Sequence, residues 1–203
     1  MKNHATFFRN SFLPSIWICL FPVILATAIA FGDGIANWTK AGISIGIAII
    51  LQIFFILFFN KIRTQNILLK NIFSGIFLGP MLTTGSYYFQ SNEINTAVFL
   101  AGVPLGLLTV AIISLKSYKQ FTAEKILRLF LWMVFTSGLM PLVIYSITND
   151  KIYSLSASAI ILMSINPIIQ LSKEKNIPLD PLIITIIRMA FLYTILFSLG
   201  WII

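Results

Sequence analysis

Seven long apolar segments follow one another along the chain, separated by short polar stretches. Each holds about 19 to 23 residues, which at 1.5 Å per residue is enough to cross a hydrocarbon core about 30 Å thick. Because backbone groups in lipid must bond to one another, the pattern predicts seven transmembrane helices, which form one polytopic, all-α helical membrane domain over residues 1–203. The segments are Phe12–Phe31, Ala41–Phe59, Ile67–Phe89, Thr96–Leu115, Ile126–Ile147, Ile152–Leu171 and Pro181–Ile203.

Composition agrees with a membrane-embedded chain. Hydrophobic residues make up 58% of the sequence and charged residues 10%, against roughly 25% charged in an average soluble domain. The mean hydropathy is +0.94. These values exclude a soluble globular enzyme and a disordered tail. The net charge of +8 is typical of basic cytoplasmic loops that meet anionic headgroups, so membrane lipid is the expected partner and nucleic acid is not.

The distribution of basic residues predicts the orientation. Eleven Lys and Arg residues flank the segments on the side of the N-terminus, and only Lys40 and Lys151 lie on the other side. The positive-inside rule therefore places the N-terminus in the cytoplasm and the C-terminus outside. Ala28-Ile29-Ala30 is similar to a signal-peptide cleavage site, but the first segment exceeds a normal signal core, so we expect a retained first helix.

Groups able to do chemistry are few. The six acids all lie in predicted loops, so a carboxylate relay for proton or sodium coupling is absent from the predicted spans. One cysteine, Cys19, and one histidine, His4, give no basis for a disulfide framework, a thiolate metal site or histidine chemistry.

Two features inside the apolar segments concern packing and charge. The pairs Gly42/Gly46 and Gly102/Gly106 have the spacing of small residues that let helices approach closely. Arg188 is the one charge deep inside a predicted span, since Lys70 and Arg128 lie within the first four residues of theirs and count with the flanking loops. Its long side chain either reaches the cytoplasmic interface along the helix surface or faces an anion in a cavity open to the cytoplasm.

Four segments together resemble the UbiA-type membrane prenyltransferases, in the branch that prenylates dihydroxynaphthoate for menaquinone. Phe8–Pro14 with Phe21–Ala30 is similar to the opening Arg…Leu-Pro segment of the family and the helix that follows it. Leu51–Ile53 resembles a Leu-Gln-Ile that precedes the first Asp motif, and Gly85–Gln90 resembles a Gly-x-Tyr-Tyr-x-Gln. Val103–Ile112 resembles a Gly-Leu-Leu helix before the second Asp motif.

The resemblance also implies what this chain has lost. Family members have nine helices, so a helix pair is missing here between the second and third segments. The two metal-binding carboxylates of the first motif correspond to Asn60 and Arg63, and Gln120 replaces the first acid of the second motif. Only Glu124 keeps a carboxylate. Magnesium needs anionic oxygen ligands to neutralise a leaving diphosphate, so we expect no metal site and no cofactor, with Mg²⁺ required only by an active enzyme.

The expected function is that of a diverged, catalytically impaired relative that binds an isoprenoid or quinone in the membrane. One alternative is an active prenyltransferase, in which cations in place of the metal hold the diphosphate; the other is a non-enzymatic component of envelope assembly or transport. The resemblance implies the bacterial inner membrane. The candidate diphosphate-facing cations are Lys61, Lys116, Lys119 and Arg188.

Overall fold

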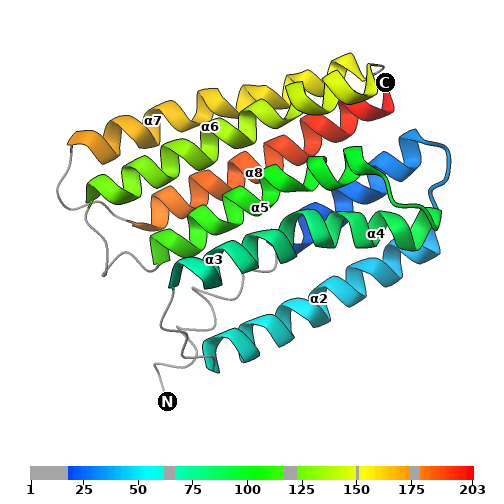
Figure 1. Cartoon of the computed structure of the whole chain (residues 1–203), viewed down its shortest axis with the longest axis horizontal. Helices are drawn as coiled ribbons and strands as arrows, with labels where there is room; N and C mark the ends of the chain where they lie inside the picture. The colour runs from blue at the N-terminus through cyan, green and yellow to red at the C-terminus, as the bar shows by residue number, and fades with distance from the viewer. Residues whose placement is uncertain (1–17, 62–66, 117–122, 150, 174–178) are drawn as a thin grey trace.

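The computed structural model describes residues 18–61, 67–116, 123–149, 151–173 and 179–203. Within these ranges the chain forms seven helical segments and no strand (Figure 1). The third segment consists of α3, η1 and α4 end to end, and the sixth of η3 and α7. The elements are the first helix Ile18–Gly32, α2 (Trp38–Lys61), α3 (Ile67–Ile76), η1 (Phe77–Met81), α4 (Leu82–Ser91), α5 (Thr96–Lys116), α6 (Ala123–Thr148), η3 (Ile152–Ala159), α7 (Ile160–Lys173) and α8 (Leu179–Ile202).

Asparagines mark several helix ends at one end of the bundle. The side chain of Asn37 accepts a hydrogen bond from the Lys40 N–H (3.0 Å) and so caps the start of α2. Asn95 caps α5 in the same way through the Ala97 N–H (2.8 Å). Asn92, with a φ of 60°, ends α4 in the left-handed conformation that asparagine tolerates. These short caps keep the loops at this end tight.

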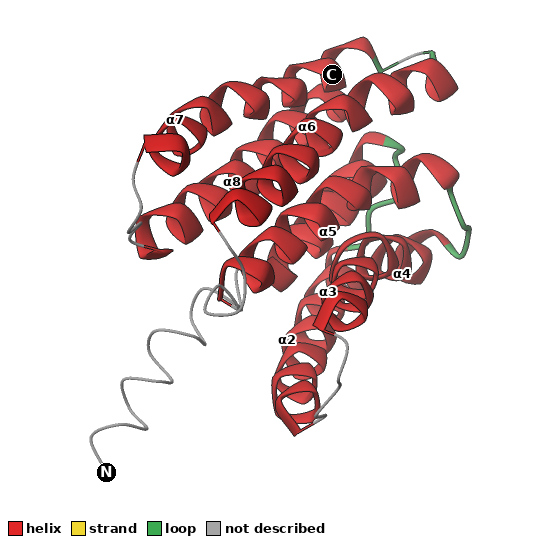
Figure 2. Ribbon diagram, turned by 60° about the vertical axis from the view of Figure 1, so that its left-hand side comes forward, coloured by secondary structure: helices red, strands yellow, loops and turns green. Residues whose placement is uncertain are grey.

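The helices alternate in direction, and α5 and α8 lie in the middle of the bundle (Figures 1 and 2). α5 packs on α3, η1, α4, α6 and α8. The Tyr193 hydroxyl of α8 donates to the Ala101 carbonyl of α5 over 2.9 Å, and both residues are buried. α2 lies at one edge, where it packs on α4, and α6 and α7 lie at the other.

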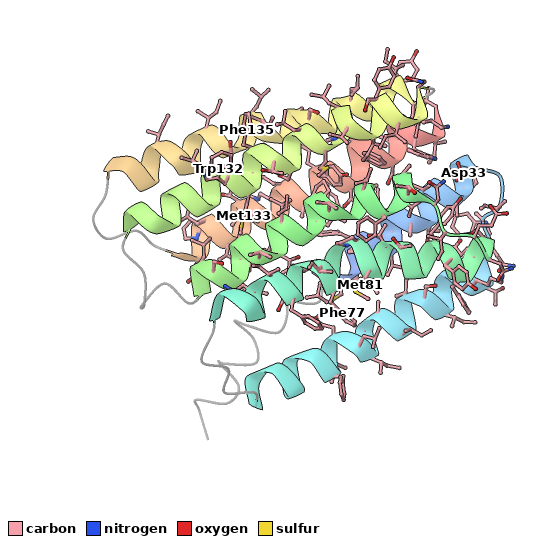
Figure 3. All side chains as sticks on the ribbon, in the orientation of Figure 1. Asp33, Phe77, Met81, Trp132, Met133 and Phe135 are labelled. Carbon is pink, nitrogen blue, oxygen red and sulfur yellow. The ribbon has the colours of Figure 1, made fainter. Side chains whose placement is uncertain are left out.

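Three helices in the described residues are long and apolar enough to cross a membrane: Thr96–Leu115, Leu131–Thr148 and Asp180–Ile202. Shorter apolar helices are Ile18–Gly32, Trp38–Phe54 and Ile152–Ile165. The surface is correspondingly apolar, as Figure 3 shows for Trp132 and Phe135 on α6, which are exposed. The structure is thus that of an all-helical protein with candidate membrane spans.

A crossing of four glycines holds α3 and η1 against α5. A Cβ added to Gly79 would lie 2.5 Å from the Gly106 Cα and 2.7 Å from the Gly102 carbonyl oxygen. A Cβ added to Gly75 would meet the Val110 side chain and would lie 3.0 Å from the Gly106 carbonyl oxygen. The predicted close packing at Gly102 and Gly106 is therefore confirmed, and its partner is the Gly75/Gly79 pair, which we did not predict from the sequence.

The same prediction is wrong for Gly42 and Gly46. Both glycines are exposed on α2, and a Cβ added to either would meet nothing within 4 Å among the described residues. The side of α2 that faces the bundle instead carries Ala41, Ser44, Ala48 and Gln52, at helical spacing. Spacing alone identified a small-residue pair but not the face that packs.

Pro80 interrupts the third segment. Proline has no N–H to donate, and the turn around it widens into the π-helix η1. The Leu82 N–H that follows reaches both the Gly79 and the Phe77 carbonyls, so the bonding pattern shifts from four to five residues at this point. Such π segments locally displace side chains and are frequent at functional sites.

Candidate functional site

The structure does not describe the side chains at the positions that correspond to the Asp motifs. The C-terminal ends of α2 and α5 and the N-terminal end of α6 lie at the same end of the bundle (Figure 1), as the topology requires. The predicted site itself remains a prediction. Arg63, Lys119 and Gln120 lie outside the described residues, and for Asn60, Lys61, Lys116 and Glu124 the structure describes the helical backbone but not the side chains.

Arg188 is described, and it is exposed on α8. It belongs to an outward stripe at helical spacing that also contains Ile184, Phe191 and Ile195, all exposed. An arginine on this face favours the interpretation in which the side chain extends along the helix surface toward the interface. It does not line the pocket described next.

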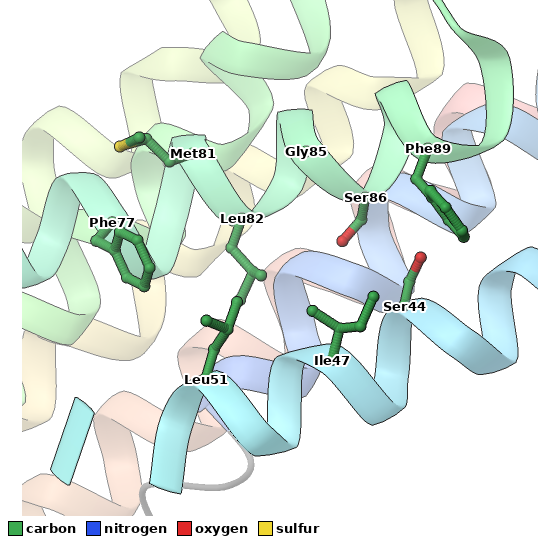
Figure 4. A pocket seen from close by; sticks show the side chains of 9 residues that line it. All are labelled: Ser44, Ile47, Leu51, Phe77, Met81, Leu82, Gly85, Ser86 and Phe89. Carbon is green, nitrogen blue, oxygen red and sulfur yellow. The ribbon is translucent and has the colours of Figure 1, made fainter. Parts of the chain in front are cut away.

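An open pocket of about 290 Å³ lies between α2 and the η1–α4 part of the third segment (Figure 4). Leu82, Gly85 and Phe89 contribute one wall at i, i+3 and i+7 spacing on α4. Four further apolar side chains and two serines complete the lining: Ile47, Leu51, Phe77, Met81, Ser44 and Ser86.

The pocket has a polar end and an apolar end. Figure 4 shows the Ser44 and Ser86 hydroxyls pointing toward the space between α2 and α4, whereas Phe77 and Leu51 lie toward the other end. Both serines are buried, and the Ser44 hydroxyl donates to the Lys40 carbonyl of its own helix (2.9 Å). Met81 and Phe89 are partly exposed, so the pocket opens on the side of the bundle.

Two of the segments that carry the family resemblance take part in this pocket. Leu51 belongs to one, and Gly85, Ser86 and Phe89 belong to another. Their glutamines hold the surrounding helices together. Gln52 accepts a hydrogen bond from the Cys19 thiol (2.7 Å), and the Gln90 amide donates to the Thr27 hydroxyl (3.1 Å), which ties α2 and α4 to the first helix.

Three residues of the pocket were not predicted from the sequence: Ser44, Phe77 and Met81. Phe77 and Met81 bound the widened turn at Pro80, whose π geometry no periodicity predicts. Ser44 had a weak signal, since it lies on the one small and polar stripe of an otherwise Ile-rich segment. That stripe indicates the buried face of α2, although it does not say that the face is incompletely filled.

The end of the bundle away from the motif positions is closed by a hydrogen-bonded cluster. The Asp33 carboxylate accepts from the Tyr87 hydroxyl (2.8 Å) and from the Trp201 indole N–H (3.0 Å), which joins the first helix to α4 and α8. The Lys151 ammonium donates to the Trp201 carbonyl (2.7 Å) and lies 5.5 Å from its ring. The polar groups of this cluster bond to one another and fix the helix ends. The pocket between α2 and α4 is therefore a better candidate for a ligand site than this cluster.

No group of three or more histidine, cysteine or acidic side chains gathers in the part of the chain that the structure describes. The fold and the pocket define the class as an all-helical protein with candidate membrane spans and a lateral, mostly apolar pocket. Comparison with known proteins adds no family, since no family model, curated protein or solved structure matches the chain.

Proposed function

We propose that this is a seven-span membrane protein that binds an isoprenoid or quinone in the pocket between α2 and α4, and that it does not transfer prenyl groups. The observation that carries the proposal is the pocket itself, which is open on its side, mostly apolar and equipped with two hydroxyls. Small-molecule sites typically combine such apolar walls with a few polar groups that fix orientation.

The resemblance to the menaquinone branch of the prenyltransferases supports the choice of ligand. Two of its four segments line the pocket, and a third, through Thr27, is bonded to the same helix. The replacement of acids by Asn60, Arg63 and Gln120 supports loss of catalysis. Without those carboxylates, magnesium would lack the oxygen ligands with which it stabilises a departing diphosphate.

A first prediction concerns catalysis. Purified protein given geranylgeranyl diphosphate and dihydroxynaphthoate should form no prenylated product above an empty-membrane control, with or without Mg²⁺. The physical reason is the missing metal-binding carboxylates. Magnesium-dependent product would establish the rival proposal, an active prenyltransferase that holds the diphosphate through cations such as Lys61, Lys116 and Lys119.

Thermal unfolding of the same sample tests the binding half of the proposal. A ligand that binds only the folded state stabilises it by about 2.7 kcal/mol at a concentration of 100 Kd. We expect an isoprenoid quinone to raise the melting temperature equally with and without Mg²⁺. If no isoprenoid changes the melting temperature, the third proposal, an assembly or transport component of the envelope, takes precedence.

A second prediction concerns topology. The bias of eleven basic residues against two supports a cytoplasmic N-terminus and an external C-terminus. Alkaline phosphatase fused after Ile203 should therefore be active, and a fusion after Lys119, in the loop before α6, should be inactive. Green fluorescent protein fused after Ile203 should not fluoresce, because it would be carried across the membrane in an unfolded form. An inactive phosphatase after Ile203 in a correctly inserted protein would contradict the seven-span arrangement.

A further inference from the structure

We infer that the pocket between α2 and α4 selects an uncharged ligand, namely an isoprenoid whose head carries a hydroxyl or carbonyl oxygen, and that this head points toward the Lys40 end of α2. The inference rests on the proposed function and adds two things to it: the charge state of the ligand and its direction. The direction is away from the bundle end where the Asp-motif positions lie.

The residues that line the pocket offer no charge to a charged head, and the nearby Lys40 ammonium already donates to the Gln90 carbonyl (3.3 Å) and lies 5.9 Å from the centre of the Phe89 ring. The nine lining residues are apolar side chains, one glycine and two serines, and none carries a formal charge. A diphosphate taken out of water needs cations or many donors, because an unpaired charge is costly in apolar surroundings. Two hydroxyls do not supply that. They do suit a single neutral oxygen: the Ser86 hydroxyl has a proton to donate to a carbonyl or hydroxyl head, whereas the Ser44 hydroxyl, which donates to the Lys40 carbonyl, can accept from a hydroxyl head.

The positions of the two serines give the direction. Ser44 is the seventh of the 24 residues of α2, and Ser86 lies five residues before the end of the third segment, which runs from Ile67 to Ser91, so both are nearer the end at which α2 begins and α4 ends. The proton of Ser44 goes to the Lys40 carbonyl, so its oxygen offers lone pairs to the pocket. The opposite end, at Leu51 and Phe77, is apolar and suits the first isoprene units (Figure 4).

The volume of the pocket and its opening on the side of the bundle suit a ligand with a long isoprenoid tail. A cavity of about 290 Å³ is at the lower limit of small-molecule sites, which span about 300–1,000 Å³. It can therefore enclose a head and the start of a chain but not a complete polyprenyl group. Met81 is 52% exposed and Ile47 45% exposed, so the rest of the chain can leave between α2 and η1 into the surrounding apolar phase.

Gly85 offers a way to fill the pocket without disturbing the helices. It lines the pocket, and a Cβ added to it meets nothing within 4 Å. Gly46 is a matched control, because it too lies in a helix with open space around an added Cβ, but it does not line the pocket. Replacing either glycine within a helix removes backbone freedom from the unfolded chain, so both variants should fold.

The test measures equilibrium binding to the full chain in lipid nanodiscs, with three probes: a menaquinone with a short isoprenoid tail, squalene as the headless hydrocarbon, and geranylgeranyl diphosphate. The parent should bind the quinone at least tenfold more tightly than the diphosphate. Gly85→Phe should weaken quinone binding at least tenfold, while Gly46→Phe should leave it within twofold. The double variant Ser44→Ala/Ser86→Ala should weaken quinone binding about three- to tenfold and leave squalene binding unchanged.

Each contrary result has a separate meaning. Diphosphate binding as tight as quinone binding, or equal losses of quinone and squalene in the double serine variant, would overturn selection by a neutral head. Quinone binding that Gly85→Phe leaves unchanged would overturn the pocket as the site while quinone binding stands. If the folded parent binds none of the probes, the proposed function itself fails.

Discussion

Replacement of Gly79 by valine is expected to destabilise the folded protein more than any other single change discussed here. The new Cβ would approach the Gly106 backbone to 2.5 Å at Cα and the Gly102 carbonyl oxygen to 2.7 Å. Backbone atoms cannot rotate away as a flexible side chain can, so η1 and α5 would have to separate. Overpacking typically costs about 1–3 kcal/mol, and a contact with backbone on a central helix belongs at or above the upper limit of that range.

The matched control is Gly46→Val, at a glycine whose added Cβ meets nothing within 4 Å. In a helix interior, valine is no worse than glycine, so its effect on the free energy of unfolding should stay within about 1 kcal/mol. Unfolding in detergent, followed by tryptophan fluorescence, should show an early transition or no folded protein for Gly79→Val alone. Equal stability of the two variants would mean that the α3–η1 and α5 backbones do not meet as described.

Replacement of Asp33 by alanine is expected to give the second largest effect. Two donors on different helices, Tyr87 and Trp201, lose the same acceptor. Hydrogen bonds to a charged group contribute about 1.5–3 kcal/mol when buried. Asp33 itself is exposed, so water replaces part of the loss, and we expect about 2 kcal/mol for the pair.

Glu93→Ala is the control for this change, because Glu93 is an exposed acid in the neighbouring loop at the same end of the bundle. It should alter the free energy of unfolding by less than about 0.5 kcal/mol. Asp33→Asn should be intermediate, since the amide keeps one acceptor oxygen. An Asp33→Ala variant as stable as Glu93→Ala would show that the Tyr87 and Trp201 bonds do not connect the three helices.

Within the described residues, the order and extent of the helices were predictable from the sequence to within a few residues; the start of the predicted first segment, Phe12–Phe31, lies outside them. Thr96–Leu115 was predicted and α5 spans Thr96–Lys116; the predicted sixth segment corresponds to η3 followed by α7. These predictions succeed because the length of an apolar run is a local property of the chain. The membrane-spanning role of all seven, and their orientation, remain predictions beyond the three candidate spans.

Features that depend on neighbouring helices were not predictable in the same way. The Gly42/Gly46 and Gly102/Gly106 pairs have identical spacing, yet only the second pair packs, because α5 is central and α2 lies at the edge. The π turn at Pro80 and the pocket beside it arise from local bonding and from incomplete filling between α2 and α4. Arg188 illustrates the same limit, since periodicity placed it in a span but could not choose between an outward and an inward face.

The most direct test of quinone binding between α2 and α4 is photo-crosslinking with an isoprenoid quinone that carries a diazirine next to its ring. The protein is labelled in nanodiscs, digested, and the modified peptides are identified by mass spectrometry. The label should fall on the polar end of the pocket, at Ser44, Ile47, Ser86 or Phe89, and excess unlabelled quinone should remove it. The labelled residue itself is located by fragmenting each peptide, because Ser44 and Asn60 lie on the same stretch between Lys40 and Lys61. Label that unlabelled quinone competes away but that lies at the opposite end, on Asn60 or Glu124 themselves, would contradict both the site and the direction of the ligand.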